Sequence, residues 1–211
     1  MKREKGFFIT LEGCEGAGKT TQVKLLSRKL TQAGFEVVCT REPGGSRTGK
    51  AIREILLNPQ NTELDAKTEV LLYAADRAQD IKENIKPALE KGMIVLADRF
   101  MASNLAYQGY GRGLSLERIK RINKWVIGDS FPDLTIIIDI DVKKGLQRAR
   151  NFSPEGDRLE TEQIEFHKRV RKGFLQLLEE DDDQRFIRFD GELPSKKLSE
   201  LIFAAVKERL K

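Results

Sequence analysis

Short apolar runs alternate with helical patterns along the chain. The third and fourth runs, M-I-V-L-A and L-T-I-I-I, are apolar on both faces, which is typical of parallel strands covered by helices. The five runs are Phe7–Leu11, Val37–Thr40, Met93–Ala97, Leu134–Ile138 and Phe186–Phe189. We therefore predict an α/β fold, a five-stranded parallel sheet with helices on both faces, in a single domain over residues 1–211.

Several helix ends can be predicted from residue type. The first helix is predicted to span Lys19–Ala33 and to end at Gly34. Ser115 is a candidate N-cap for a helix that ends near Gly128, and Ser195 for the last helix. The inward faces of the first and last helices are expected to be Val23, Leu26, Leu30 and Ala33, and Leu198, Leu201, Ile202 and Ala205.

The composition describes a globular protein with a charged surface, since 39% of the 211 residues are hydrophobic and 34% are charged. The net charge of +5 suits either nucleic acid or a site that holds several phosphates. We favour the second, and expect no nucleic-acid partner, because Lys and Arg are not clustered in runs. Cys14 and Cys39 suggest free thiols in a reducing compartment. Without a signal peptide or an apolar stretch of about 18 residues, we expect a cytoplasmic protein with no membrane partner.

A phosphate-loop pattern stands between the first predicted strand and the first predicted helix. In F-F-I-T-L-E-G-C-E-G-A-G-K-T, the second half fits G-x-x-x-x-G-K-[ST]. Its glycines let backbone N–H groups point at a phosphate, and Lys19 adds a charge near the β- and γ-phosphates. Thr20 supplies a hydroxyl for Mg²⁺, and Cys14 is interpreted as a small filler. The residues expected to bind the nucleoside triphosphate are Gly13, Cys14, Glu15, Gly16, Ala17, Gly18, Lys19, Thr20 and Thr21.

Charged residues follow three of the predicted strands. Thr40–Ser46 follows the second run, Asp98–Phe100 the third, and Asp139 and Asp141 the fourth. Since ligands bind at the carboxyl ends of parallel strands, we expect these segments to form one site.

Asp98 and Arg99 are the most informative pair at these strand ends. Asp98 is a candidate Mg²⁺ ligand, direct or through water. The alternatives are a salt bridge with Arg99 or a cap on the next helix. Arg99 is placed to hold an acceptor phosphate with a rigid cationic fork.

The chain offers arginines rather than a general base. Its one histidine, His167, lies in a charge-rich helical stretch and is expected at the surface. A phosphate acceptor is already an anion, so it needs positive charge instead of deprotonation. This favours a nucleoside monophosphate kinase over a sugar kinase. The arginines available are Arg41, Arg53, Arg77, Arg99, Arg148, Arg150 and Arg158.

Two other classes of protein fit the sequence less well. A GTPase switch would carry D-x-x-G and N-K-x-D elements, but no Asp here has Gly three residues later. The stretch Asn123–Val126 has Val where the second element needs Asp. A nucleic-acid binder would show clustered aromatic and basic residues, which are not present.

Taken together, the motifs resemble those of the bacterial thymidylate kinase family. The likeness runs nearly end to end through these segments: L-E-G-C-E-G-A-G-K-T-T, T-R-E-P-G-G, Y-A-A-D-R-A, D-R-F-M-A-S-N-L-A-Y-Q-G-Y-G-R-G, P-D-L-T and D-R-L-E. The resemblance implies transfer of the γ-phosphate of ATP to dTMP, giving dTDP and ADP, with Mg²⁺. It also implies a homodimer of packed helices, for which the stretch Thr68–Leu89 offers a candidate face.

The resemblance also implies roles for individual residues. Tyr73 occupies the place of an aromatic, usually Phe, that stacks on thymine, and Arg77 that of a donor to thymine O4. Core packing of Tyr73 and Tyr107, and pairing of Arg77 with Asp76 or Asp80, are the alternatives. The substrate-binding positions implied are Glu42 near the sugar and metal, Arg53 and Arg99 on the acceptor phosphate, Tyr73 and Arg77 on the base, Asn104 and Gln108 facing base and sugar, and Tyr107 against a ribose 2′-OH.

The segment Arg148–Arg158, Q-R-A-R-N-F-S-P-E-G-D-R with the preceding Gln, is predicted to be a lid. The phosphate loop has no arginine, so we expect Glu15 to orient a cation that comes from elsewhere. Arg150 is the first choice for a lid residue that reaches the transferring phosphoryl group, and Arg158 and Arg148 follow. The alternative is a solvated loop whose arginines pair with Glu155 and Asp157. The lid spacing departs from the family pattern, where a further arginine falls at the position of Phe152. The catalytic set expected is Lys19, Glu15, Arg99 and Arg150.

Overall fold

The computed structural model describes residues 5–152, 155–181 and 183–210. All five predicted strands form one parallel sheet in the order β2-β3-β1-β4-β5, which confirms the predicted fold class. The strands are β1 (Phe7–Glu12), β2 (Val37–Arg41), β3 (Ile94–Asp98), β4 (Leu134–Asp139) and β5 (Phe186–Asp190).

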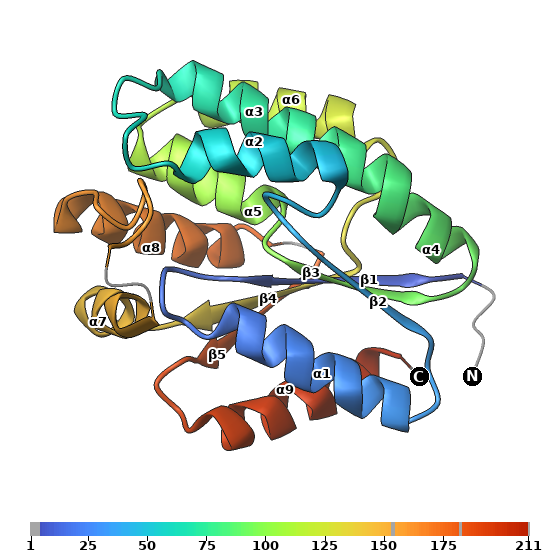
Figure 1. The fold of residues 1–211 in the computed structure, drawn as a ribbon. Coiled ribbons are helices and arrows are strands. Elements are labelled where there is room, and N and C mark those ends of the chain that lie inside the picture. Colours follow the sequence, from blue (N-terminus) through green and yellow to red (C-terminus); the bar gives the residue numbers. More distant parts are fainter. Residues whose placement is uncertain (1–4, 153–154, 182, 211) are drawn as a thin grey trace.

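Helices cover both faces of this sheet (Figure 1). Helices α1 and α9 lie on one face, and α2 to α6 with α8 lie on the other. The bounds are α1 (Lys19–Gln32), α2 (Arg47–Leu57), α3 (Ala66–Asp80), α4 (Lys86–Glu90), α5 (Met101–Asn104), α6 (Leu116–Ile127), α7 (Val142–Phe152), α8 (Ile164–Glu179) and α9 (Ser195–Arg209). Two π-helical stretches, η1 (Ile81–Ile85) and η2 (Leu105–Gly111), continue α3 and α5.

The core consists of apolar layers on either side of the sheet. Alternate residues of β1 point to opposite faces, so Ile9 packs with Leu26 and Ile202 while Phe8 packs with Val95 and Phe100. All of these side chains are buried. The carboxyl ends of the strands are thereby fixed side by side, where the functional residues were expected.

Most predicted helix ends are confirmed. Helix α1 begins at Lys19 as predicted but ends at Gln32, one residue early. Ala33 is exposed, so the prediction that it faces inward is wrong. The Ser115 hydroxyl accepts a hydrogen bond from the Arg118 N–H, and α6 ends at the residue before Gly128.

The prediction for the last helix is wrong in two respects. Pro194 takes the N-cap position of α9, and Ser195 is its first helical residue, with its hydroxyl bonded by the Gln22 amide. Leu201 is 42% exposed, because the buried face follows a four-residue spacing through Leu198, Ile202 and Val206.

No helix in the described part of the chain combines the length and the apolar character needed to cross a membrane.

Candidate active site

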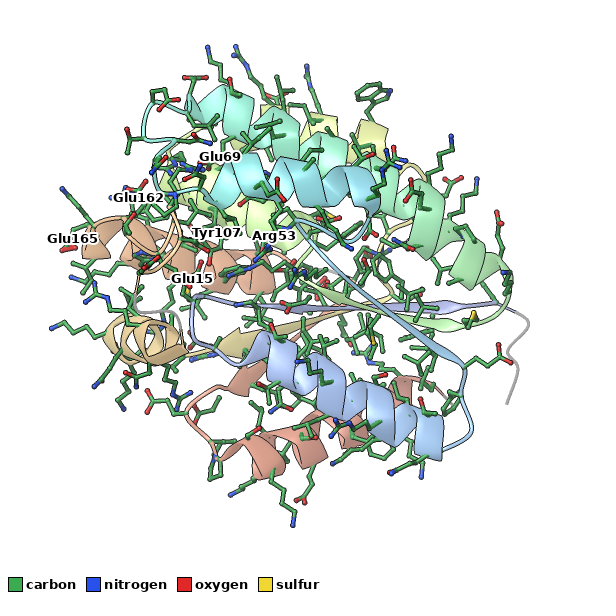
Figure 2. All side chains as sticks on the ribbon, viewed as in Figure 1. Glu15, Arg53, Glu69, Tyr107, Glu162 and Glu165 are labelled. Carbon is green, nitrogen blue, oxygen red and sulfur yellow. The ribbon has the colours of Figure 1, made fainter. Side chains whose placement is uncertain are left out.

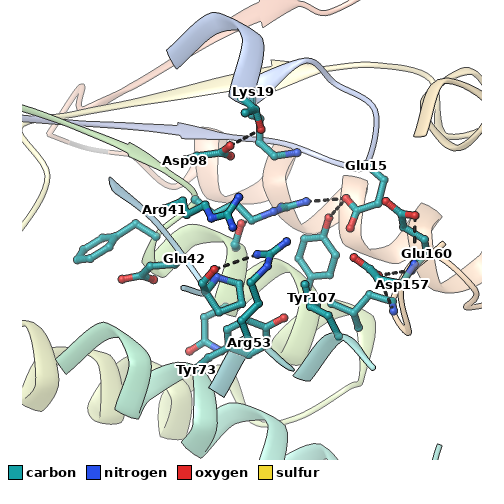
Figure 3. A pocket seen from close by; sticks show the side chains of 18 of the residues that line it. Glu15, Lys19, Arg41, Glu42, Arg53, Tyr73, Asp98, Tyr107, Asp157 and Glu160 are labelled. Carbon is teal, nitrogen blue, oxygen red and sulfur yellow. Dashed lines mark hydrogen bonds and ion pairs between the residues drawn. The ribbon is translucent and has the colours of Figure 1, made fainter. Parts of the chain in front are cut away.

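A cavity of about 450 Å³ opens at the carboxyl ends of the strands. Figure 3 shows Lys19 and Asp98 on one wall, with Arg53 and Tyr73 across from them. Every predicted substrate-binding residue lines it, which brings together segments from α2, α3, α5 and η2: Glu42, Arg53, Tyr73, Arg77, Arg99, Asn104, Tyr107 and Gln108.

The phosphate loop forms one wall of the cavity. The Lys19 side chain is 7% exposed, and its Nζ donates to the Cys14 carbonyl at 2.7 Å, so the lysine curls back over the loop. Gly18 has a φ of 93° and serves as the N-cap of α1, a left-handed conformation that glycine adopts without strain. Of the predicted loop residues, the cavity is lined by Glu15, Gly16, Gly18, Lys19, Thr20 and Thr21, whereas Gly13, Cys14 and Ala17 lie behind it.

Cys14 is inert in this position. Burial raises the pKa of its thiol to about 12, with the charge of Glu15 adding to the rise. A thiol that stays protonated is a poor nucleophile, which supports its interpretation as a small filler.

The loop touches α7 backbone to backbone at Gly16 and Gly145. A Cβ on Gly16 would lie 2.0 Å from the Gly145 carbonyl oxygen, and one on Gly145 would lie 2.4 Å from the Glu15 carbonyl oxygen. Only glycine permits this approach at either position, so the phosphate loop and the first turn of α7 are in direct contact.

Glu15 holds a cation, and that cation is Arg99. Arg99 Nη2 lies 2.7 Å from Glu15 Oε2, and Nη1 donates to the Gly13 carbonyl at 2.9 Å. The Tyr107 hydroxyl donates to the same Glu15 oxygen, and the guanidinium lies 4.9 Å from the centre of the Tyr107 ring. Burial alone would raise the pKa of Glu15, but Arg99 and Lys19 outweigh it and hold the pKa below its ordinary value. The carboxylate therefore stays charged and orients Arg99.

Arg77 is fixed from two sides. Its Nε and Nη2 donate to Glu42 Oε2 at 2.9 and 2.7 Å, and its Nη1 donates to Asn123 Oδ1 at 2.6 Å. The guanidinium lies 5.1 Å from the centre of the Phe100 ring and is 1% exposed. The alternative that Arg77 pairs with Asp76 or Asp80 is thus wrong, because Glu42 is the carboxylate that it reaches.

The last residue of α5 and the π-helical stretch η2 present three predicted residues to the cavity. Asn104, Tyr107 and Gln108 are buried but line it. The Asn104 amide N–H donates to Gln108 Oε1 at 2.7 Å, and among the described residues Asn104 Oδ1 is a buried acceptor without a hydrogen-bond partner. Since buried polar atoms are nearly always paired, this oxygen suits an N–H of a bound molecule.

Glu69 of α3 is a buried hub that the sequence did not reveal. Its Oε1 accepts from Gln108 Nε2 at 2.6 Å, and its Oε2 lies 2.5 Å from Arg158 Nη2. Arg112 reaches Glu69 at 3.2 Å and also pairs with Glu162. Figure 2 labels Glu69 and Glu162, which lie near one another in this view. One carboxylate thus joins the cavity wall to the segment that leads into α8.

The predicted lid is divided between several environments. Residues 148–152 end α7, residues 153–154 lie outside the described part of the chain, and 155–158 lead away from it. Arg148 donates to the Gly191 carbonyl at 2.8 Å, and Arg158 is buried, with Nε donating to the Leu56 carbonyl at 2.8 Å. Arg150 is exposed and does not line the cavity, whereas its neighbour Ala149 does. Its catalytic role stays a prediction.

Three residues at the end of the lid and just after it line the cavity without having been predicted as site residues: Asp157, Leu159 and Glu160. Burial raises the pKa of both carboxyls. Within the described residues, Arg148, Arg150 and Arg158 make no ion pair with Glu155 or Asp157, so the proposed solvated pairing is not seen there.

Asp98 and Thr20 offer a small oxygen-only site. The Thr20 hydroxyl donates to Asp98 Oδ2 at 2.5 Å, and both side chains line the cavity. Hard oxygen donors fit Mg²⁺, which usually takes one or two protein ligands together with phosphates and waters. No set of three or more His, Cys, Asp or Glu side chains is arranged to hold a metal within residues 5–152, 155–181 and 183–210.

The fourth strand contributes less than expected. Asp139 is paired with Arg171 at 2.7 Å and with Arg188 at 2.6 Å. These arginines hold the pKa of Asp139 below its ordinary value, against the effect of burial. Neither Asp139 nor Asp141 lines the cavity, so the expectation of three strand ends in one site is wrong for this strand.

His167 is not at the surface, contrary to expectation. It is 1% exposed on the inner face of α8, with its ring edge-on to Phe166 at 5.4 Å between centroids. Burial lowers its pKa, so the imidazole is neutral. The charged residues next to it in the sequence occupy the outer face of the same helix, which is why the sequence suggested a surface position for His167.

Positive charge is crowded on the acceptor side of the cavity. Arg53 Nη1 donates to the Pro43 carbonyl at 2.9 Å, and burial lowers the pKa of Arg53, with Arg41 adding to the effect. Arg41 itself lines the cavity and is exposed. An anion bound between these side chains would relieve their repulsion.

Comparison with known proteins gives the same picture as the geometry. A family model described as Thymidylate kinase matches residues 11–202. The chain is 54% identical over 205 residues to the thymidylate kinase of Halothermothrix orenii, covering 96% of this chain and 97% of that protein. It is 47% identical to the thymidylate kinase of a Geobacillus strain, covering 98% of each. A crystal structure of thymidylate kinase from Ehrlichia chaffeensis superimposes with a TM-score of 0.78 at 32% identity, covering 96% of this chain and 99% of that one.

Proposed function

The chain belongs to the thymidylate kinase family, and on this premise we propose that its cavity transfers the γ-phosphate of ATP to dTMP, giving dTDP and ADP. The observation that carries this proposal is the arrangement of cations around the cavity. Lys19 stands on the phosphate-loop side, and Arg53 and Arg99 stand on the acceptor side. A donor triphosphate and an acceptor phosphate can therefore meet between them.

The reaction needs no general base from the protein. The dTMP phosphate is an anion that attacks the γ-phosphorus directly, so the barrier lies in bringing two anions together. Arg99, oriented by Glu15 and flanked by the Tyr107 ring, is placed to hold the attacking phosphate. Lys19 is placed to stabilise the charge that develops on the β–γ bridge.

We further propose that Thr20 and Asp98 hold Mg²⁺ together with the donor phosphates. When bound there, the ion would supply positive charge that offsets the negative charge of the donor phosphates. The short contact between the two side chains and the all-oxygen donor set support this assignment.

On the acceptor side, we propose that the thymine base stacks on Tyr73 and accepts a hydrogen bond at O4 from Arg77. The buried Asn104 Oδ1 suits the N3–H of the base. Glu42 and Asn123 keep the Arg77 donors in place. Gln108 fixes the Asn104 amide in turn. A preorganised set of donors and acceptors of this kind discriminates strongly between bases.

We propose that the active form is a homodimer built on α3 and α6. Leu71 is 58% exposed and Trp125 is 85% exposed, on two helices that pack together. Large exposed apolar side chains on one layer are typical of an interface. The predicted face, Thr68–Leu89, covers the α3 part of this surface.

The function can be tested by steady-state kinetics with ATP across dTMP, dUMP, dCMP, dAMP and dGMP. We expect dTMP to be the preferred acceptor and dCMP to be at least about tenfold poorer in kcat/KM. The 4-amino group of cytosine would present a donor to the Arg77 donors, a mismatch of about 1–3 kcal/mol. Equal kcat/KM for dTMP and dCMP would contradict the assignment of Arg77, and turnover of none of them would contradict the kinase itself.

A further inference from the structure

Glu12 is a buried carboxylate that lies behind the cavity rather than in it. It is the last residue of β1 and is 0% exposed. Its Oε1 accepts from the Phe100 N–H at 2.9 Å and from the Ser103 N–H at 3.3 Å, and its Oε2 accepts from the Ser103 hydroxyl at 2.5 Å. Burial raises the pKa of this carboxyl, and these donors together with Arg99 oppose the rise. All three contacts are with donors, which suits the ionised form.

Through these contacts Glu12, at the end of β1, caps the N-terminus of α5, which is far from it in the sequence. Helix α5 begins at Met101, two residues after Arg99, and its N-cap residue, Phe100, supplies no side-chain cap. Glu12 takes that role by accepting the free N–H groups of the first turn. A charged acceptor is also favoured at a helix N-terminus by the aligned peptide dipoles.

The same contacts secure an unusual backbone. Arg99 has a φ of 73°, although it is not glycine, a strained conformation that persists only where the surroundings enforce it. Its own N–H donates to the Leu11 carbonyl at 3.0 Å. Leu11 and Glu12 thus hold the chain on both sides of the strained residue.

Ser103 extends this control to the guanidinium. Its hydroxyl proton points to Glu12, so its oxygen is left to accept from Arg99 Nη1 at 3.1 Å. Because Arg99 can only donate, Ser103 must act as the acceptor, and Glu12 holds the Ser103 hydroxyl in the orientation that leaves its oxygen free for this bond. Ser103 lines the cavity and Glu12 does not, so the Glu12 carboxylate acts on the cavity only indirectly.

We propose that Glu12 is a positioning residue for the acceptor phosphate, acting through the Arg99 backbone and through Ser103 on the Arg99 guanidinium. This proposal rests on the proposed function, since it takes Arg99 as the residue that binds that phosphate. The carboxyl end of β1 would then position the acceptor phosphate, whereas the phosphate loop that follows it binds the donor.

A double-mutant cycle tests the proposal by calorimetric titration of dTMP and of ATP. Glu12→Gln keeps the shape but turns an amide donor toward donor groups, so we expect dTMP binding to weaken about tenfold. ATP binding should stay within about twofold. In an Arg99→Ala background, Glu12→Gln should cause no further loss of dTMP affinity. Additive losses, or equal losses for ATP and dTMP, would overturn the proposal.

Ser103→Ala provides a second route if Glu12→Gln does not fold. It leaves the carboxylate and the backbone caps in place and removes only the hydroxyl link, so its loss of dTMP affinity should also vanish in the Arg99→Ala background. Ser199→Ala is the matched control, because Ser199 is buried on α9 away from the cavity, and it should change neither affinity. Failure of the wild-type protein to bind or phosphorylate dTMP would count against the proposed function, whereas additive effects in an active enzyme would count only against Glu12.

Discussion

At the scale of single residues, the partners of each cationic side chain decide what it can do. Arg77 and Arg99 are held by carboxylates and cannot swing, so they suit recognition of a fixed group. Arg158 is equally fixed but faces Glu69 in the interior. Arg41 and Arg150 are exposed and are therefore free to move onto a ligand.

Lys19 is expected to be needed for chemistry but not for folding. Burial lowers its pKa, with Arg99 adding to the effect, so its charged form is already disfavoured in the fold and its removal should not destabilise the protein. Lys19→Met should abolish phosphoryl transfer with a melting temperature close to wild type. Activity near the wild-type level would show that this loop is not the donor site.

Arg158 is expected to have the opposite behaviour. Arg158→Ala removes the ion pair to Glu69 and the bond to the Leu56 carbonyl. It leaves the buried carboxylate with Arg112 and Gln108, so we expect about 2–3 kcal/mol less stability. Urea unfolding measures this loss. Arg150→Ala, at an exposed position of the same region, is the control and should stay within about 0.5 kcal/mol of wild type.

At the scale of elements, features encoded by neighbouring residues could be predicted from the sequence, whereas contacts between distant residues could not. The strands, the phosphate loop and the Ser115 cap are written in contiguous residues, so the sequence revealed them. The Arg77–Glu42 pair and the Glu69–Arg158 pair join residues 35 and 89 positions apart, and residue type alone does not select among the possible partners. This is why Glu42 was not expected to hold Arg77 and why the hub at Glu69 was missed.

Two of the wrong predictions, for His167 and Leu201, have a common cause. His167 and Leu201 lie on amphipathic helices where one residue of rotation exchanges the inner and outer faces. The structure places His167 inside and Leu201 outside, which neighbouring charges could not decide. Pro194 displaced the cap from Ser195 by a single position.

The catalytic role predicted for the lid residue Arg150, which lies near the end of α7, can be tested by mutation. Arg150→Ala should lower kcat by orders of magnitude, as loss of an arginine that contacts the transferring phosphoryl group does, while the affinity for dTMP barely changes. Single-turnover kinetics together with dTMP titration make this distinction. Lys143→Ala, at the exposed start of the same helix, is the control and should leave kcat unchanged. If kcat survives in Arg150→Ala and only the KM for dTMP rises, the residue belongs to acceptor binding.

At the scale of the whole molecule, the sheet separates two tasks. One face of the sheet lies under α1 and α9 (Figure 1) and is closed by apolar packing. The helices on the other face complete the cavity, and two of them, α3 and α6, expose Leu71 and Trp125. The site and the proposed dimer surface thus lie in the same helical layer.

The dimer can be tested by charge at its centre. Leu71→Glu combined with Trp125→Glu should convert a dimer into a monomer in sedimentation velocity, because buried unpaired carboxylates oppose association. Leu201→Glu, at an exposed apolar position on α9, should leave the sedimentation coefficient unchanged. A wild-type protein that sediments as a monomer would refute the proposed assembly.

The contact between Gly16 and Gly145 links the binding of the donor triphosphate to the orientation of α7. The two backbones approach so closely at Gly16 and Gly145 that a Cβ at either position would collide with the other backbone, so a shift of one backbone there is not absorbed by a change of side-chain rotamer. A tilt of α7 must therefore alter the loop that grips the donor triphosphate, and a bound triphosphate must alter the orientations open to α7. By reciprocity, the factor by which the donor favours one orientation of α7 equals the factor by which that orientation tightens donor binding.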